Sequence, residues 1–187
     1  MGKYERIKEF QVLGFNTPEI LYIRRGALVD LRIVGEFFKD CERGSIRTYS
    51  DDESKNFKCP HYPNRQIPEL MELFPKIVDQ YHVMLAKPVD PNDTLWCGNL
   101  VVDPDGEEVY VEAIKGPGTV RDLDRRAHDL DRKMRVSWWR AQGEPWDIVI
   151  PEAVQFPRRG VVIEWSYYRV PVGMKKRQLI FWEYRPY

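Results

Sequence analysis

The stretch NLVVDPDGEEVYVEAIKGPGTVRDLDRRAHDLDRKM, residues Asn99–Met134, decides the fold of this chain. Two runs of β-forming residues, Leu100–Asp103 and Glu107–Ile114, flank the tripeptide Pro104-Asp105-Gly106. A turn tripeptide between two such runs is a strong signal for a hairpin. The sequence therefore predicts two neighbouring antiparallel strands near the middle of the chain.

The second run ends at a glycine turn, Gly116-Pro117-Gly118, and Thr119 is a good cap for a helix that follows. An apolar stripe at steps of three or four residues predicts that this helix covers 119–134; its members are Val120, Leu123, Ala127, Leu130 and Met134. A strand, a glycine turn and a helix N-terminus together expose unpaired N–H groups, which suit an anion. Gly116, Gly118 and Thr119 are therefore candidate anion-binding residues; alternatively, the two glycines only form a tight turn.

The composition is that of a globular protein, with 43% hydrophobic and 31% charged residues among 187. The length fits one domain, residues 1–187, with a division into two lobes of about 1–88 and 89–187 as a further option.

Lys+Arg and Asp+Glu balance at 29 each, so no overall electrostatic field favours binding to nucleic acid or a membrane, although a local basic patch is still an option. No apolar run has membrane-spanning length and no signal peptide precedes the charged start, so we expect a cytoplasmic protein.

The three cysteines, Cys41, Cys59 and Cys97, are odd in number and widely spaced, which is not typical of a disulfide framework. Cys59 lies two residues before His61, but no second pair of cysteines or histidines stands at the spacing of zinc ligands. The sequence therefore argues against a structural zinc site.

The remaining segments mix helical and strand patterns. Helices are predicted over 3–13 and from Pro68 onward, whereas strands are predicted over 19–24, 45–49, 81–87, 161–168 and 178–184. The polar stretch 50–65 predicts a long loop, and the proline-marked stretch 145–157 has no clear pattern. Interleaved elements joined by short turns indicate an α+β protein, with a mostly antiparallel sheet and helices packed on one face.

Two glutamates occupy the middle of the last two strands. If these strands pair, Glu164 and Glu183 fall opposite or nearly opposite each other, with Cβ atoms about 4.5–5.5 Å apart. Two carboxylates so placed repel each other, and a divalent ion such as Mg²⁺ removes the conflict. The alternatives are that each pairs with a nearby arginine, such as Arg185, or that a register slip of one residue separates their faces.

Three cations are candidates for contact with an anion. Arg47 and Lys87 are single cations in otherwise apolar or small-residue strands, a position that a solvated edge residue also occupies. Arg121 lies in the first turn of the predicted helix 119–134, close to Gly118. The other charges of that helix form a solvated face with pairs such as Asp122–Arg126.

Taken in order, these segments resemble the ATP-grasp fold, nearest to its phosphoenolpyruvate synthase branch. KYERIKEFQVLGFNTPEILYI resembles the opening of the family, SIRTY its nucleotide-site strand, and YHVMLAKPVD the strand that carries a nucleotide-contacting lysine. NLVVDPDGEEVYVEAI resembles the core hairpin, and VVIEWSYY with LIFWEYRP resembles the strands whose acidic residues hold magnesium. The resemblance implies that Arg47 and Lys87 contact a nucleotide and that Glu164 and Glu183 hold Mg²⁺.

The resemblance also implies a function, namely ATP-dependent activation of a carboxylate as an acyl-phosphate for ligation. The end motif of the family places an asparagine two residues after the glutamate, where this chain has Arg185 after Glu183. We therefore expect an ATP- and Mg²⁺-binding protein that is either a ligase-type enzyme with a small-molecule acceptor or a degenerate, non-catalytic relative. The alternative from another class is a non-catalytic module for RNA or a regulatory ligand, in which the pair Trp138-Trp139 would stack on bases.

Overall fold

The computed structural model describes residues 3–52, 58–87, 91–105, 107–116, 132–137, 142–169 and 179–186. The chain divides into two compact units. Unit 1 comprises Met1–Glu5 and Pro18–Val89, and unit 2 comprises Arg6–Thr17 and Asp90–Tyr187. The first helix, α1 (Lys3–Val12), spans this division. Each unit is α+β, as the sequence predicts.

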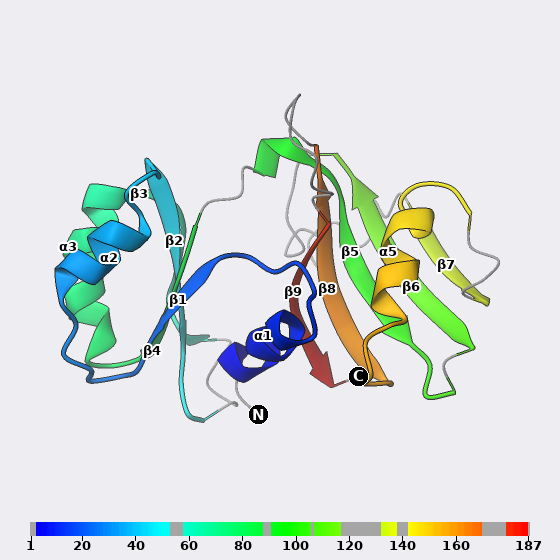
Figure 1. Ribbon diagram of the computed structural model, residues 1–187, viewed down its shortest axis with the longest axis horizontal. Coiled ribbons are helices and arrows are strands. Elements are labelled where there is room, and N and C mark those ends of the chain that lie inside the picture. The colour runs from blue at the N-terminus through cyan, green and yellow to red at the C-terminus, as the bar shows by residue number, and fades with distance from the viewer. Residues whose placement is uncertain are drawn as a thin grey trace. The chain divides into compact units, whose positions relative to one another are not determined.

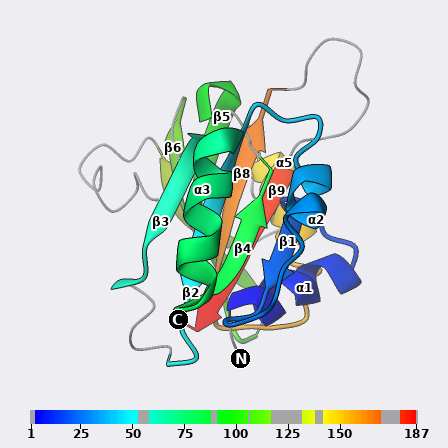
Figure 2. The same cartoon turned by 90° about the vertical axis from the view of Figure 1, so that its left-hand side faces the viewer.

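Unit 1 is a four-stranded antiparallel sheet with two helices on one face, which Figure 2 shows in front of the strands. The strand order is β1-β4-β2-β3. The elements in chain order are β1 (Ile20–Ile23), α2 (Leu31–Phe37), β2 (Arg43–Tyr49), β3 (His61–Gln66), α3 (Ile67–Val78) and β4 (His82–Ala86).

Helix α3 supplies much of the core of unit 1. Pro68 sits in its first turn, where a missing N–H costs nothing. Its apolar residues recur at steps of three and four and turn one stripe toward the sheet. The buried cluster comprises Ile23, Val34, Phe38, Ile46, Leu70, Phe74, Ile77, Val78, Val83 and Leu85. The other face of the sheet is thereby left to side chains such as Tyr22, Arg47 and His82.

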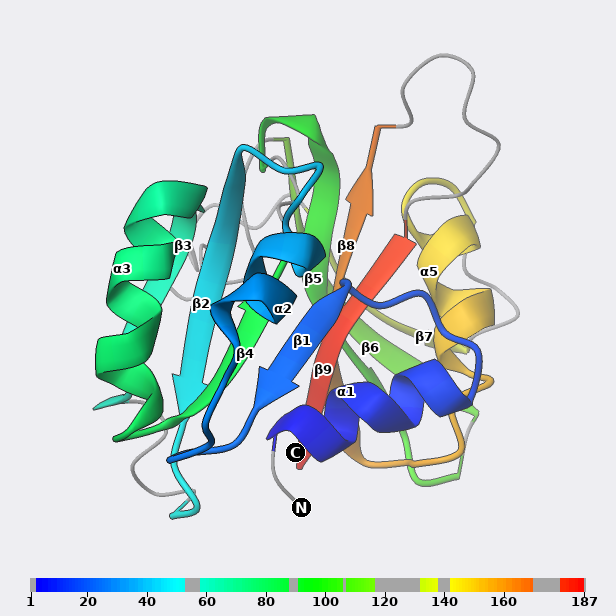
Figure 3. The same cartoon turned by 60° about the vertical axis from the view of Figure 1, so that its left-hand side comes forward.

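Unit 2 is a five-stranded antiparallel sheet in the order β7-β6-β5-β8-β9. Figure 1 shows α5 along this sheet, and Figure 3 shows β8 beside β9. A short 3₁₀ turn, η2 (Pro91–Asp93), precedes β5. The remaining elements are β5 (Thr94–Val102), β6 (Glu108–Lys115), β7 (Arg132–Ser137), α5 (Trp146–Ala153), β8 (Val161–Tyr168) and β9 (Leu179–Pro186).

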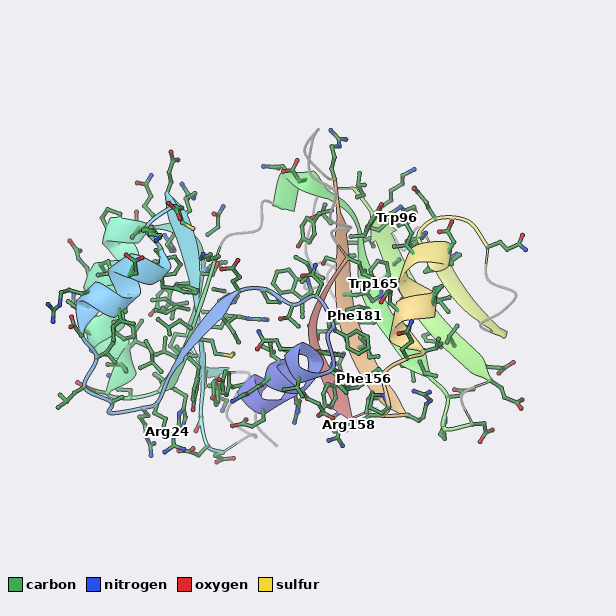
Figure 4. All side chains as sticks on the ribbon, viewed as in Figure 1. Arg24, Trp96, Phe156, Arg158, Trp165 and Phe181 are labelled. Carbon is green, nitrogen blue, oxygen red and sulfur yellow. The ribbon has the colours of Figure 1, made fainter. Side chains whose placement is uncertain are left out.

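Aromatic residues dominate the core of unit 2. Trp96, Trp165, Phe181 and Phe156 follow one another along the sheet in Figure 4, and each is at most 4% exposed. Phe10 of α1 joins them, with its ring centroid 4.6 Å from that of Phe156. Large aromatic rings bury much apolar area each, so this cluster stabilises the layer between the sheet and its helices.

Three predictions about secondary structure are confirmed. The runs around Pro104-Asp105-Gly106 form the antiparallel pair β5–β6, and the last two predicted strands form the antiparallel pair β8–β9. The first predicted helix is α1. Gly14 follows it with φ +83°, a conformation that suits glycine at the end of a helix.

The predicted helix 119–134 is wrong at its end, because Arg132–Ser137 is the edge strand β7, paired with β6. Met134 and Val136 alternate with charged residues, so this segment also fits the two-residue period of a β-strand. Without β7, strand β6 would be the edge of the sheet, and its outer N–H and C=O groups would lack partners. Pairing with β6 therefore favours a strand over a helix here. Residues 117–131 lie outside the described residues.

Two further stretches contain structure that the sequence analysis missed. The predicted loop 50–65 includes most of β3, an edge strand that tolerates Pro63 because an edge N–H needs no partner. The stretch 145–157 contains the helix α5. Its buried residues stand at the spacing of a helical stripe, which Pro145 before the helix and Pro151 inside it obscured; they are Trp146, Val149, Ile150 and Ala153.

Within the described ranges, no helix combines the length and the apolar character needed to cross a membrane.

Candidate acidic site on the sheet of unit 2

A row of polar residues crosses the sheet of unit 2. Glu112 on β6 pairs in register with Asn99 on β5, and Asn99 pairs with Glu164 on β8. Glu164 pairs in turn with Glu183 on β9. Direct partners in antiparallel strands share a face of the sheet, so these four side chains form one row. We call Glu164 and Glu183 the acidic pair. The prediction that they stand opposite each other is confirmed.

The acidic pair lies on the face opposite the apolar core. Leu100, Ile163 and Tyr184, which alternate with the row along the strands, belong to the buried cluster on the other face. The side chains of a strand point alternately to the two faces, so the row faces away from α5.

A register shift between Glu164 and Trp165 determines where Glu183 points. Trp165 pairs with Phe181, and both belong to the core, whereas the next pair is Glu164 with Glu183. Trp182 is therefore the extra residue of a bulge. Without it, Glu183 would share the core face with Phe181, so the bulge turns this carboxylate toward Glu164. The indole of Trp182 donates a hydrogen bond of 2.8 Å to Ser166 Oγ.

The environment of the row is enclosed. Glu183 is 6% exposed, and the side chain of Glu164 is 19% exposed. Arg185 Nε lies 3.6 Å from Glu164 Oε1, and the hydroxyl of Tyr110 donates a 2.7 Å hydrogen bond to Glu112 Oε1. The buried side-chain oxygen of Asn99 accepts no hydrogen bond from the described part of the chain.

These groups offer oxygen ligands to a hard cation. Burying a carboxylate is costly unless a cation or hydrogen bonds compensate it. Mg²⁺ is usually bound by one or two carboxylates, with water and phosphate oxygens completing its shell. Across the described residues, no group of three or more His, Cys, Asp or Glu side chains could hold a metal. The acidic pair with Asn99 is thus a two-carboxylate set with one amide oxygen.

The predicted nucleotide-contacting cations belong to unit 1, whereas the acidic pair belongs to unit 2. Lys87 Nζ lies 2.7 Å from Glu19 Oε2 and 5.5 Å from the ring centroid of Phe37. The hydrogen bond to Glu19 raises the pKa of Lys87, so this amine keeps its charge. Arg47 is half-buried on β2, in register with His61 on one side and Met84 on the other.

The glycine turn is described only at its start. Gly116 has φ +91°, a conformation that suits glycine, and its N–H donates a 2.9 Å hydrogen bond to the carbonyl of Leu95. Gly118, Thr119 and Arg121 lie outside the described residues, as does the pair Trp138-Trp139. The anion-binding hypothesis for this turn stays a prediction.

Asn99 was not predicted to lie beside the acidic pair. The sequence does indicate that Asn99 pairs with Glu112, because a hairpin centred on Asp105 and Gly106 places these two residues opposite each other. Which strand lies on the other side of β5 was not readable from the sequence, because pairing between strands distant in sequence leaves no local pattern.

Comparison with protein-family models gives no match to this chain, and comparison with curated proteins gives none either.

Proposed function

We propose that the acidic pair binds Mg²⁺ together with the phosphates of a nucleotide, of which ATP is the expected one. The observation that carries this proposal is the register of β8 and β9, which pairs Glu164 directly with Glu183. Neighbouring carboxylates on one face of a sheet repel each other, and a divalent ion between them converts the repulsion into attraction.

The donor chemistry supports a magnesium ion. Glu164 and Glu183 supply carboxylate oxygens, and Asn99, in register beside Glu164, supplies an amide oxygen that lacks a described donor. Phosphate and water oxygens are the usual remaining ligands. Arg185 competes for Glu164, because its Nε lies 3.6 Å from Oε1.

The residues of the chain would act mainly by charge. Glu164 and Glu183 hold the ion, and the amides of 116–119 with Arg121 neutralise the phosphates. A bound Mg²⁺–nucleotide would supply phosphoryl-transfer chemistry of the ligase type toward a small-molecule acceptor. Arg185 weakens the metal by repulsion, so binding is favoured over turnover.

The test is isothermal titration of the full chain with ATP, in Mg²⁺ and in a chelator. We expect Glu183→Gln to weaken binding about tenfold or more in Mg²⁺ and to change little in the chelator. The matched control is Glu112→Gln, in the same row but two strands away from Glu164, a distance of about 10 Å.

Two results would contradict the proposal. Equal affinity of the wild type and Glu183→Gln in Mg²⁺ would make Glu183 a structural residue. Binding of ATP that is indifferent to Mg²⁺ would favour the alternative, a module for RNA or a regulatory ligand.

A further inference from the structure

His82, the first residue of β4, connects two side chains that are distant in sequence. The hydroxyl of Tyr22 on β1 lies 2.9 Å from its Nδ1, and Asp51 Oδ1 lies 2.8 Å from its Nε2. All three residues belong to unit 1. We call Tyr22, His82 and Asp51 the tyrosine relay.

A further contact fixes the direction of these hydrogen bonds. The backbone N–H of Arg25 donates to His82 Nδ1 over 3.3 Å. A nitrogen that accepts from an N–H carries a lone pair, so the proton of the neutral ring is on Nε2 and is donated to Asp51. The hydroxyl of Tyr22 therefore donates to Nδ1, and the phenol is hydrogen-bonded to a base that a carboxylate orients.

Aromatic stacking holds the relay in place. The ring of Tyr22 stacks on Tyr4 with centroids 4.0 Å apart and planes 13° apart. The ring of His82 stacks on Tyr49, its partner in register across β2 and β4, with centroids 4.9 Å apart. Both contacts restrict ring rotation, so the hydrogen bonds of the relay are pre-organised.

The relay is exposed and positively charged at its Asp51 end. The side chain of His82 is 12% exposed and that of Asp51 is 66% exposed, while Tyr22 is half-buried. Arg25 Nη2 lies 3.3 Å from Asp51 Oδ2, and exposed Arg24 is labelled at the end of β1 in Figure 4. The hydrogen bond from His82, and then the fields of Arg25 and Arg24, lower the pKa of Asp51, so its carboxylate is ionised at neutral pH.

We propose that Tyr22 is a nucleophile that accepts a phosphoryl group, with His82 as its general base and Asp51 as a positioning residue. The arrangement is that of a nucleophile, a base and an orienting carboxylate, with a phenol in the place of an alcohol. The arginines favour an anionic donor, which selects a phosphoanhydride or acyl phosphate. This site uses none of the residues of the acidic pair.

The phenolic oxygen of Tyr22 attacks phosphorus and forms a new P–O bond, while the bond from phosphorus to the leaving oxygen breaks with its electron pair. The phenolic proton moves to His82 Nδ1, and the imidazolium so formed is stabilised by the carboxylate of Asp51. His82 then gives this proton to the leaving group or to water. No oxidant or reductant takes part.

Acetyl phosphate, a small phosphoryl donor, is the probe for this step. The full chain is incubated with it without divalent metal, and phosphotyrosine is located by peptide mass spectrometry. We expect phosphate on Tyr22, none in Tyr22→Phe, and at least about a tenfold slower reaction in His82→Gln and Asp51→Asn. Glutamine at 82 can still donate to Asp51 but has no basic nitrogen in the place of Nδ1.

The matched control is Tyr81→Phe, which removes a hydroxyl next to His82 in the chain but outside the relay, and should leave the rate unchanged. Thermal melting of each variant reports folding. Asp51→Asn, at an exposed residue, decides the result if His82→Gln does not fold. A second readout is labelling by an arylsulfonyl fluoride, which reacts with activated phenols and needs no phosphate site.

Tyr22 labelled faster than Tyr81 by both reagents, with the rate lost in the relay variants, supports the proposal. Labelling of Tyr22 at the same rate in wild type, His82→Gln and Asp51→Asn would overturn it and make the relay a structural connection. Labelling of Tyr22 by the sulfonyl fluoride but not by acetyl phosphate would overturn the proposal that Tyr22 accepts a phosphoryl group. Because no metal is present, none of these outcomes depends on the acidic pair.

Discussion

Glu9 shows how one carboxylate in α1 is held within unit 2. Arg158 Nε donates to both of its oxygens, at 2.9 and 3.1 Å, and the hydroxyl of Tyr184 donates to Oε2. Burial alone would raise the pKa of Glu9, but the hydrogen bonds from Arg158 and Tyr184 outweigh it, so this pKa is lowered. Burial and the same carboxylate raise the pKa of Tyr184 to about 12, so the phenol stays a donor at neutral pH.

This environment predicts how stability depends on pH. Because the pKa of Glu9 is lower in the folded protein than its usual value of 4.5, the carboxylate stabilises the fold above that value. The contribution is lost as pH falls through the folded pKa. We expect Glu9→Gln to lower the free energy of unfolding by about 1–2 kcal/mol at pH 7, and by progressively less as the pH falls from 4.5 through the folded pKa.

Urea denaturation of the wild type and Glu9→Gln at pH 7 and over a series of pH values below 4.5 measures this difference. Glu5→Gln, an exposed residue of the same helix, is the matched control and should change little. A destabilisation by Glu9→Gln that is the same at pH 7 and throughout the acidic series would show that the charge of Glu9 does not stabilise its contacts with Arg158 and Tyr184.

Gly98 lies on β5 beside Asn99, where three strands meet closely. A Cβ at this position would lie 2.1 Å from the carbonyl oxygen of Glu112 and 2.8 Å from the ring of Trp165. Backbone atoms of a paired strand have no room to move aside. We expect Gly98→Ala to destabilise the protein by about 3 kcal/mol or more.

The control for this change is Gly35→Ala in α2, where the added Cβ meets nothing within 4 Å. Alanine there should be neutral or stabilising by up to about 1 kcal/mol. Thermal melting compares the two variants. A Gly98→Ala protein as stable as the wild type would mean that β5 and β6 can separate, and would weaken the account of the row that crosses them.

Among the helices and strands, local sequence patterns predicted the hairpin pairs but not which strands form the edges of the two sheets. The pair β5–β6 and the pair β8–β9 follow from short-range signals, namely a turn tripeptide and two β-rich runs. The face of Glu183 depends on the bulge at Trp182, which no local pattern announces. The edge strand β7 was mistaken for the end of a helix because Met134 fits both periods.

Helix α5 was missed although it carries part of the core, and its contribution is measurable. Ile150 is 1% exposed and packs in the cluster of unit 2. We expect Ile150→Ala to lower the free energy of unfolding by about 2–4 kcal/mol. Ile33→Ala, at a residue of α2 that is 56% exposed, is the matched control and should stay within about 0.5 kcal/mol. Equal effects of the two changes in denaturant melts would contradict the packing of α5.

Over the whole molecule, basic and acidic residues are equal in number, although charged side chains of one sign are grouped locally. The chain has 29 basic and 29 acidic residues, yet the acidic pair stands in one row with Asn99, and Arg185 lies next to it. The sequence predicted the acidic pair and its face-to-face register. It could not supply Asn99 as a neighbour, nor the tyrosine relay, because both depend on pairing between distant strands.

Arg185 bears on the activity that we propose for this protein. A cation beside the proposed metal site would repel Mg²⁺, and the repulsion grows where solvent screening is weak. We expect ADP release by the wild type to be weak against a panel of amino acids and polyamines. Arg185→Asn should tighten Mg²⁺-dependent ATP binding several-fold, whereas Arg169→Asn, at an exposed residue, should not. Robust acceptor-dependent ADP release by the wild type would contradict this expectation.

A crystal structure of the full chain with ATP and Mn²⁺ in the place of Mg²⁺ would test the proposed metal site directly. Anomalous scattering then locates the metal without assumption about its ligands. We expect a peak between the carboxylates of Glu164 and Glu183, at about 2.0–2.3 Å from their oxygens, that disappears in Glu183→Gln. A peak elsewhere, or the guanidinium of Arg185 seated between the two carboxylates with nucleotide bound, would contradict it.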